Sequence, residues 1–140
     1  MKEGKIERMA TNRRKATNFQ SWIQKWLEAE GWLVHNEEIG GRFKVQRDIF
    51  GCIDLIAKKG CYTLWIQAKA SSRPALKPVK EKFDKVPWAE SDMPMLWVKR
   101  ANNKVDIFAY KESGFFLIAK IINNKLKINL KDRRCEWLKK

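Results

Sequence analysis

The chain has 140 residues, of which 44% are hydrophobic and 11% aromatic. This size and aromatic content indicate one compact domain and exclude a disordered basic tail. Its 30 Lys and Arg exceed its 16 Asp and Glu by 14, an excess that predicts a polyanionic partner, most commonly nucleic acid. No apolar run approaches the roughly 20 residues of a membrane span, so we expect no membrane attachment.

Histidine and cysteine usage narrows the possible chemistry. A single histidine, His35, excludes sites within one chain that need two imidazoles, such as His-ligated zinc centres and HNH nuclease sites. The three cysteines are odd in number and have no C-x-x-C spacing, which is typical of a reducing, intracellular and cytoplasmic setting. Any catalysis therefore has to use carboxylates, amides and lysines.

The N-terminal part of the chain divides into an arm and a helix. Residues 1–12 are polar and basic without sustained periodicity, so we expect a flexible arm, followed by a single domain over residues 13–140. From Ala16 to Leu27, apolar residues recur every three or four positions, which predicts an amphipathic helix. Gly31 supplies its stop signal.

The rest of the chain is mainly a pattern of strands. Two apolar runs, 53–57 and 62–68, flank a Lys-Lys-Gly turn and are rich in β-branched and aromatic residues, which predicts a central hairpin. A short helix is expected over 79–88, before and around Pro87. Further strands are predicted over 33–38, 43–48, 95–98, 105–110, 115–122 and 126–130, with turns at Gly40-Gly41, Asn102-Asn103 and Asn123-Asn124. The predicted combination of helices and strands indicates an α/β domain.

Asp54 is the first candidate for chemistry. Residues 39–80 contain nine Lys and Arg but only two acids, Asp48 and Asp54, and the second lies within the apolar run CIDLIA. An ionised carboxylate inside a strand costs several kcal/mol or more unless it is paired or binds a metal. Asp54 is therefore either the partner of Lys69 in an ion pair or a ligand of a divalent metal.

Gln67, Ala68 and Lys69 complete this candidate site. In a hairpin that turns at residues 58–60, positions 54 and 67 lie close together, and alternation places Gln67 and Lys69 on one face. Oxygens of Asp54, of the Gln67 amide and of the Ala68 carbonyl would suit Mg²⁺, with Mn²⁺ as a substitute. Lys69 would orient the attacking water or stabilise the charged phosphate.

Asp54 followed by Gln67-x-Lys69 resembles the signature of the PD-(D/E)XK nuclease superfamily. The setting, from Arg13 to Ala70, resembles the Holliday-junction resolvases of archaea and their phages. This resemblance implies a restriction-endonuclease-like core, which is a mixed central β-sheet flanked by helices. It also implies metal-dependent hydrolysis of phosphodiester bonds, with Asp54, Gln67 and Lys69 as catalytic residues.

The sequence departs from the family pattern at two positions. Gln67 stands where the family usually has Glu, and Gln20 stands where the opening helix often has a Glu ligand. Asp48, six residues before Asp54, could supply a second carboxylate if the strand alternates regularly, and an ion pair with Arg47 or a strand-end cap is the alternative. Fewer anionic ligands predict weaker metal binding.

These observations lead to one expected function and two alternatives. We expect a Mg²⁺-dependent endodeoxyribonuclease, with branched DNA among its candidate substrates. We also expect a homodimer, because symmetric cutting of two strands needs two sites. A non-catalytic nucleic-acid-binding module of the same fold and an RNA-processing nuclease are the alternatives. Trp88, beside Pro87, is considered for DNA contact. The basic residues expected to bind DNA phosphates, unless they only form a solvated face, are Arg47, Arg73, Lys77, Lys80 and Lys82.

Overall fold

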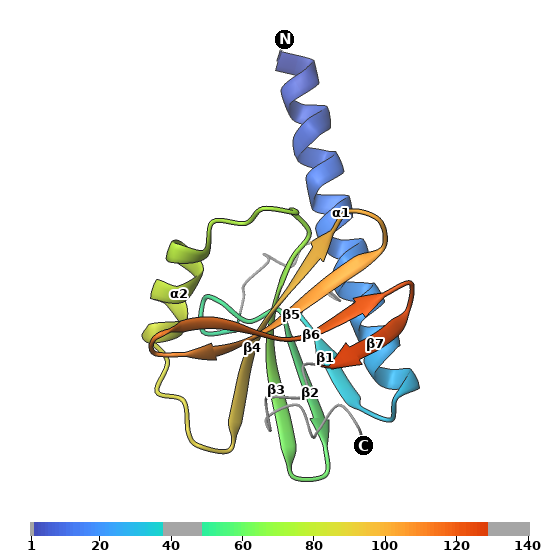
Figure 1. Ribbon diagram of the computed structural model, residues 1–140. Coiled ribbons are helices and arrows are strands. Elements are labelled where there is room, and N and C mark those ends of the chain that lie inside the picture. The colour runs from blue at the N-terminus through green and yellow to red at the C-terminus, as the bar shows by residue number, and fades with distance from the viewer. Residues whose placement is uncertain (1, 38–48, 129–140) are drawn as a thin grey trace.

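The fold is built on one sheet with a helix on each face (Figure 1). The computed structural model describes residues 2–37 and 49–128, and within them seven strands lie in sequence order in a single sheet. All neighbouring strands are antiparallel except β3 and β4, which are parallel and are connected through α2. The predicted α/β fold with a mixed sheet flanked by helices is therefore confirmed. The elements are α1 (Lys2–Ala29), β1 (Leu33–Asn36), β2 (Leu55–Lys59), β3 (Tyr62–Lys69), α2 (Leu76–Asp84), β4 (Asp92–Arg100), β5 (Lys104–Lys111), β6 (Gly114–Ile122) and β7 (Lys125–Ile128).

The first helix is longer than the sequence pattern predicts. We expected order from Arg13, but α1 already begins at Lys2, so the segment expected as a flexible arm forms the first turns of the helix. Its residues are mostly good helix formers such as Lys, Glu, Arg and Ala, and no proline interrupts them. These turns extend beyond the sheet (Figure 1). Apolar periodicity misses them because it reports only the part of a helix that packs.

The predicted stop at Gly31 is confirmed. Gly31 has a φ of +93°, a value that few residues other than glycine adopt readily. The amide of Trp32 donates to the carbonyl of Leu27, and the amide of Gly31 donates to that of Glu28, both at 3.0 Å. These two bonds satisfy carbonyls at the helix end in the pattern of a Schellman motif.

The two helices cover opposite faces of the sheet. Phe19, Ile23 and Leu27 of α1 are buried in the larger core cluster, which includes Met95 and Trp97 of β4. On the other face, Val79 and Phe83 of α2 pack in a second cluster with Leu96 and Val98 of β4. Because β4 lies between both layers, its central residues are apolar without alternation.

Several element boundaries differ from those predicted. The strand expected from residue 53 begins at Leu55, so Asp54 precedes β2 instead of lying within it. The helix expected over 79–88 covers Leu76–Asp84, since the first turn of a helix tolerates Pro78 and the chain leaves helical geometry before Pro87. The segments 43–48 and 131–140, and the Gly40-Gly41 turn, lie outside the described residues. No helix that the structure describes combines the length and the apolarity needed to cross a bilayer.

Candidate active site

Backbone hydrogen bonds fix Asp54 between the first and third strands. A tight loop precedes it, in which Ile49 and Ile53 exchange backbone bonds of 2.8 and 2.9 Å. The amide of Asp54 donates to the carbonyl of Ile66 at 2.8 Å, and its carbonyl accepts from the amide of Glu37 at 3.0 Å. Asp54 is therefore held on both sides although it lies outside the strand, which leaves its side chain at the end of the sheet.

Asp54, Gln67 and Ala68 form a buried polar cluster. The side chain of Gln67 donates from Nε2 to Asp54 Oδ2 at 2.9 Å, and the backbone amide of Ala68 donates to the same oxygen at 2.9 Å. Asp54 is 6% exposed and Gln67 is 7% exposed. The register that pairs Leu55 with Ile66 produces this contact, so the predicted convergence of positions 54 and 67 is confirmed.

Lys69 lies beside this cluster without neutralising it. It is half-buried at the end of β3, and alternation along the strand places it on the same face as Gln67. Lys69 takes part in none of the ion pairs found among the described residues. The ion pair between Asp54 and Lys69, which the sequence left as an alternative, is therefore absent there.

Gln20 of α1 carries a buried acceptor without a partner among the described residues. It is 4% exposed, and its Oε1 has no hydrogen-bond partner among the residues that the structure describes. One turn further along α1, Gln24 Oε1 accepts from Asn36 Nδ2 at 3.2 Å, and Asn36 pairs with Leu55, the residue after Asp54. A buried acceptor without a partner costs about 1–3 kcal/mol. Sequence reasoning missed Gln24 and Asn36, because a single amide on a helix or strand has no distinctive spacing.

These donor atoms, which include one carboxylate, would suit a hard divalent cation. Asp54 would supply the negative charge, and the Ala68 carbonyl and the Gln67 amide would supply neutral oxygens. Gln20 Oε1, on α1, is a further neutral oxygen without a partner among the described residues, but α1 packs on the face opposite to Gln67. Mg²⁺ commonly takes one or two carboxylates and fills its other positions with water and phosphate oxygens. In the described part of the chain, no three His, Cys, Asp or Glu side chains gather into a metal-binding group, so any cation here meets little negative charge.

The amide orientation of Gln67 adds a further condition. Its Nε2 lies 2.9 Å from Asp54 Oδ2 and 3.4 Å from the Ala68 carbonyl oxygen, so the NH₂ group faces two of the predicted ligand oxygens. A cation held by those oxygens would require this amide to turn and present its Oε1. The remaining predicted ligand, Asp48, and its neighbour Arg47 lie outside the described residues.

The basic residues after Lys69 differ in their surroundings. Arg73, Lys77 and Lys82 are exposed. Lys80 Nζ instead donates to Asp84 at 2.8 Å, one turn along α2. The segment that carries Arg73 is tied to the end of β4, because a guanidinium nitrogen of Arg100 donates to the carbonyl of Ser72. Three of the four described residues that we expected to contact phosphates are therefore exposed and form no ion pair with another described residue.

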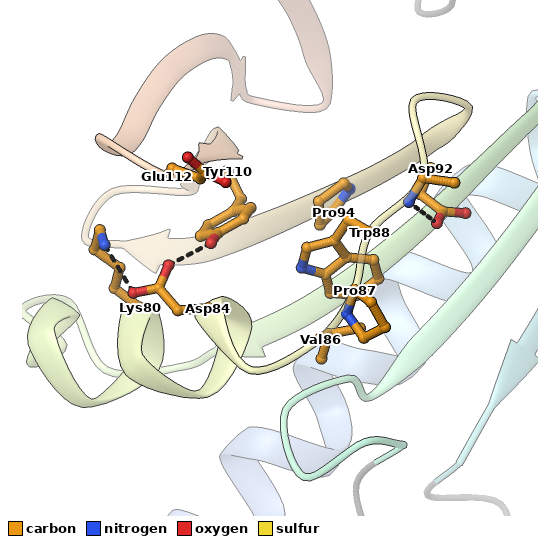
Figure 2. Close-up of a pocket in the computed structure, with 10 residues that line it drawn as sticks. Lys80, Asp84, Val86, Pro87, Trp88, Asp92, Pro94, Tyr110 and Glu112 are labelled. Carbon is orange, nitrogen blue, oxygen red and sulfur yellow. Dashed lines mark hydrogen bonds and ion pairs between the residues drawn. The ribbon is translucent and has the colours of Figure 1, made fainter.

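A pocket of about 680 Å³ beyond α2 is acidic (Figure 2). Its lining includes Asp84, Asp92 and Glu112, together with Trp88 and Tyr110. Hydrogen bonds from Lys80 and then from Tyr110 hold the pKa of Asp84 below its ordinary value. Burial and the bond to Asp84 raise the pKa of Tyr110.

The surroundings of Trp88 disfavour the DNA contact considered for it. Its ring lies 5.8 Å from that of Trp65 and 6.0 Å from that of Phe83, measured between centroids. Its indole nitrogen donates to the carbonyl of Phe83 at 2.9 Å. Trp88 thus packs against the core at the wall of a pocket whose carboxylates repel phosphate.

Comparisons with known proteins find a likeness among solved structures only. No protein-family model matches the sequence, and no curated protein matches it. Among solved structures, the chain is similar to Hjc, a Holliday junction resolvase from the archaeal hyperthermophile Archaeoglobus fulgidus. The TM-score is 0.49 and the identity 16%, over 73% of this chain and 86% of that chain. With so few identical residues, the function has to be inferred from the residues of this chain.

Proposed function

We propose that the chain is a metal-dependent nuclease that hydrolyses phosphodiester bonds of DNA at the cluster of Asp54, Gln67, Ala68 and Lys69. One observation carries the proposal: a buried carboxylate, an amide and a backbone carbonyl lie together at the end of the sheet, with a lysine beside them that forms no ion pair with the described residues. A buried carboxylate beside a lysine in this arrangement is typical of a functional site.

Each residue has a distinct role in this proposal. Asp54 and the Ala68 carbonyl would hold Mg²⁺, or Mn²⁺ in its place, and the amide oxygens of Gln67 and Gln20 would complete the protein's share of the ligands. The bound cation would polarise the phosphate and lower the pKa of a bound water. The ammonium group of Lys69 stabilises the additional negative charge that develops on the phosphate when water attacks. The half-buried position of Lys69 strengthens this effect because less water screens its charge.

The substrate is proposed from the charge of the protein. An excess of 14 positive charges attracts a polyanion, and Arg73, Lys77 and Lys82 are exposed in the segment that follows Lys69. A DNA backbone that contacts these residues would bring a phosphate to the cluster. Cutting both strands of a branched DNA needs two such sites, so the proposed active form is a homodimer.

A non-catalytic DNA-binding module is the second candidate function. The orientation of Gln67 favours it, because an NH₂ group that faces Asp54 and the Ala68 carbonyl satisfies both oxygens without a cation. The single carboxylate of the cluster also limits its affinity for metal. Under this alternative the chain binds the same DNA and leaves it intact.

A cleavage assay separates the two candidates. The full chain is incubated with a four-way junction, linear duplex, single-stranded DNA and RNA, each with Mg²⁺, Mn²⁺ or EDTA. Cleavage of DNA with either metal, lost with EDTA and in the Asp54→Asn variant, is the expected result. Binding without cleavage under every condition would favour the second candidate, and cleavage of RNA alone would reassign the substrate.

A further inference from the structure

A second pocket, of about 480 Å³, lies between α1 and two hairpin turns. One turn joins β4 to β5 and the other joins β6 to β7. The lining combines aromatic rings, amides and ammonium groups, and none of the described residues that form it is acidic. They are Asn18, Phe19, Trp22, Lys99, Asn103, Lys104, Val105, Asn123 and Asn124.

A backbone hydrogen bond joins the two turns that carry the asparagines. Asn103, Asn123 and Asn124 have φ values of 57°, 51° and 64°, in the left-handed region that asparagine tolerates well in tight turns. The amide of Asn123 donates to the carbonyl of Asn103 at 3.1 Å, which ties one turn to the other. Turn formation explains why asparagine is suitable at these positions, but it does not require three of the amides to line one pocket with Asn18.

The chemistry of the lining matches a nucleotide. The rings of Phe19 and Trp22 are stacked with an interplanar angle of 22° and a centroid distance of 6.1 Å, and the half-buried Trp22 forms part of the wall. Aromatic side chains stack on any nucleobase, asparagine amides match the donors and acceptors of base edges, and lysines bind phosphates. The pocket beside α2 has the opposite charge. Lys80 is the one lysine in its described lining, and it bonds to Asp84.

We propose that this pocket binds one unpaired nucleobase, with its phosphate on Lys99 and Lys104. The inference rests on the proposed function only in that the chain must bind nucleic acid. Lys69 pairs with Val98 and shares its face of the sheet, on the α2 side, whereas Lys99 is the next residue of β4 and faces α1, so the pocket lies at the same end of the sheet as the candidate cluster but on the other face. A strand whose phosphate lies at Lys69 would pass around this end of the sheet to place an unstacked base between α1 and the turns.

The turn between β4 and β5 offers a matched pair of variants. Asn102 and Asn103 are neighbours with φ values of 62° and 57°, but only Asn103 lines the pocket. Glycine adopts such φ values without strain, so Asn103→Gly removes an amide from the pocket and Asn102→Gly removes one outside it, with the same effect on the turn. Asn124→Gly repeats the test at the second turn, and equal melting temperatures would verify the fold of each variant.

Binding is measured by fluorescence anisotropy in EDTA, so that the result does not depend on cleavage. The probes are a labelled single-stranded oligonucleotide and a blunt duplex of the same sequence, with a nucleoside monophosphate as competitor. We expect Asn103→Gly and Asn124→Gly each to weaken single-strand binding by roughly fivefold or more, as loss of a good base contact does. Asn102→Gly should remain within about twofold of the parent, and duplex binding should be unchanged because its bases are stacked.

Equal affinities of Asn103→Gly and Asn102→Gly for the single strand would overturn the proposal. So would an equal loss of affinity for the duplex, since that would indicate a general change in the surface. If the monophosphate competes, the pocket accepts a free nucleotide as well as one within a strand. If it does not compete, the pocket accepts only a base within a strand. Loss of cleavage by Asp54→Asn is a separate result, so either proposal can fail while the other stands.

Discussion

The side-chain nitrogen Nε2 of Gln67 lies 2.9 Å from the carboxylate oxygen Oδ2 of Asp54, a residue thirteen positions earlier in the chain. The backbone amide of Ala68 donates to the same oxygen, so Asp54 Oδ2 accepts two hydrogen bonds in a buried position. The same NH₂ group faces the Ala68 carbonyl at 3.4 Å. The Gln67 side chain thus donates to two proposed metal ligands when no metal is bound. A metal could bind these two oxygens only if the Gln67 side chain moved.

The first prediction concerns the proposed catalytic pair. Asp54→Asn and Lys69→Ala should each lower the rate of metal-dependent cleavage by about 10²–10³, the usual effect of losing one group that stabilises developing charge. DNA affinity measured in EDTA should change little, because neither residue belongs to the exposed basic residues near α2. Lys58→Ala is the matched control, since Lys58 is an exposed lysine on β2. A parental rate in either site variant would remove that residue from the mechanism.

The second prediction uses Gln67→Glu to test the metal site by stability. A second carboxylate at this position would face Asp54 at hydrogen-bond distance, and two like charges in a buried place disfavour the folded state. Without metal, the variant should therefore melt at a lower temperature than the parent at pH 7. Mg²⁺ should raise its melting temperature more than that of the parent, because a carboxylate binds this ion better than an amide does. Equal responses to Mg²⁺ would place residue 67 outside the ligand set.

The sequence was sufficient to predict the strands that carry the site. The hairpin of β2 and β3 follows from two apolar runs around a lysine-glycine turn, and its register brings Asp54 to Gln67 as expected. The orientation of the Gln67 amide could not be predicted, because it depends on the positions of Asp54 Oδ2 and the Ala68 carbonyl in three dimensions. Residue spacing describes which face a side chain occupies and not which end of its amide points inward.

Two other features depend on contacts that leave no pattern in the sequence. The sequence places Lys80 among its basic neighbours, but its bond to Asp84 one turn later neutralises part of the charge of α2 locally. The asparagine pairs were correctly predicted as turns, but their common pocket requires that the two turns meet above α1. Neither relationship follows from local propensity, since each depends on how the layers are arranged.

The third prediction concerns stability at high pH. Burial and the hydrogen bond to Asp84 raise the pKa of Tyr110 above its ordinary value of 10.0, so the folded state keeps the phenolic proton that the unfolded state loses. The unfolded state then binds fewer protons, and the free energy of unfolding falls as the pH rises above about 10. Tyr110→Phe should be less stable than the parent at pH 7 and should lose less stability between pH 9 and pH 11. Urea unfolding at these pH values measures the difference, and parallel curves for both proteins would contradict the assignment.

The last prediction separates free from paired charges on the side of α2. If Arg73 and Lys77 contact DNA phosphates, log affinity for duplex DNA should fall linearly with log salt, with a slope of about −0.9 per phosphate neutralised. Removing both by Arg73→Ala and Lys77→Ala should reduce the steepness by roughly 1–2 units and weaken binding to all sequences alike, because phosphate contacts carry no base information. Lys80→Ala is the matched comparison: its ammonium already bonds to Asp84, so its loss should change the slope less. If the double variant keeps the parental slope, these residues only form a solvated surface, and the DNA-binding face has to be sought elsewhere on this basic protein.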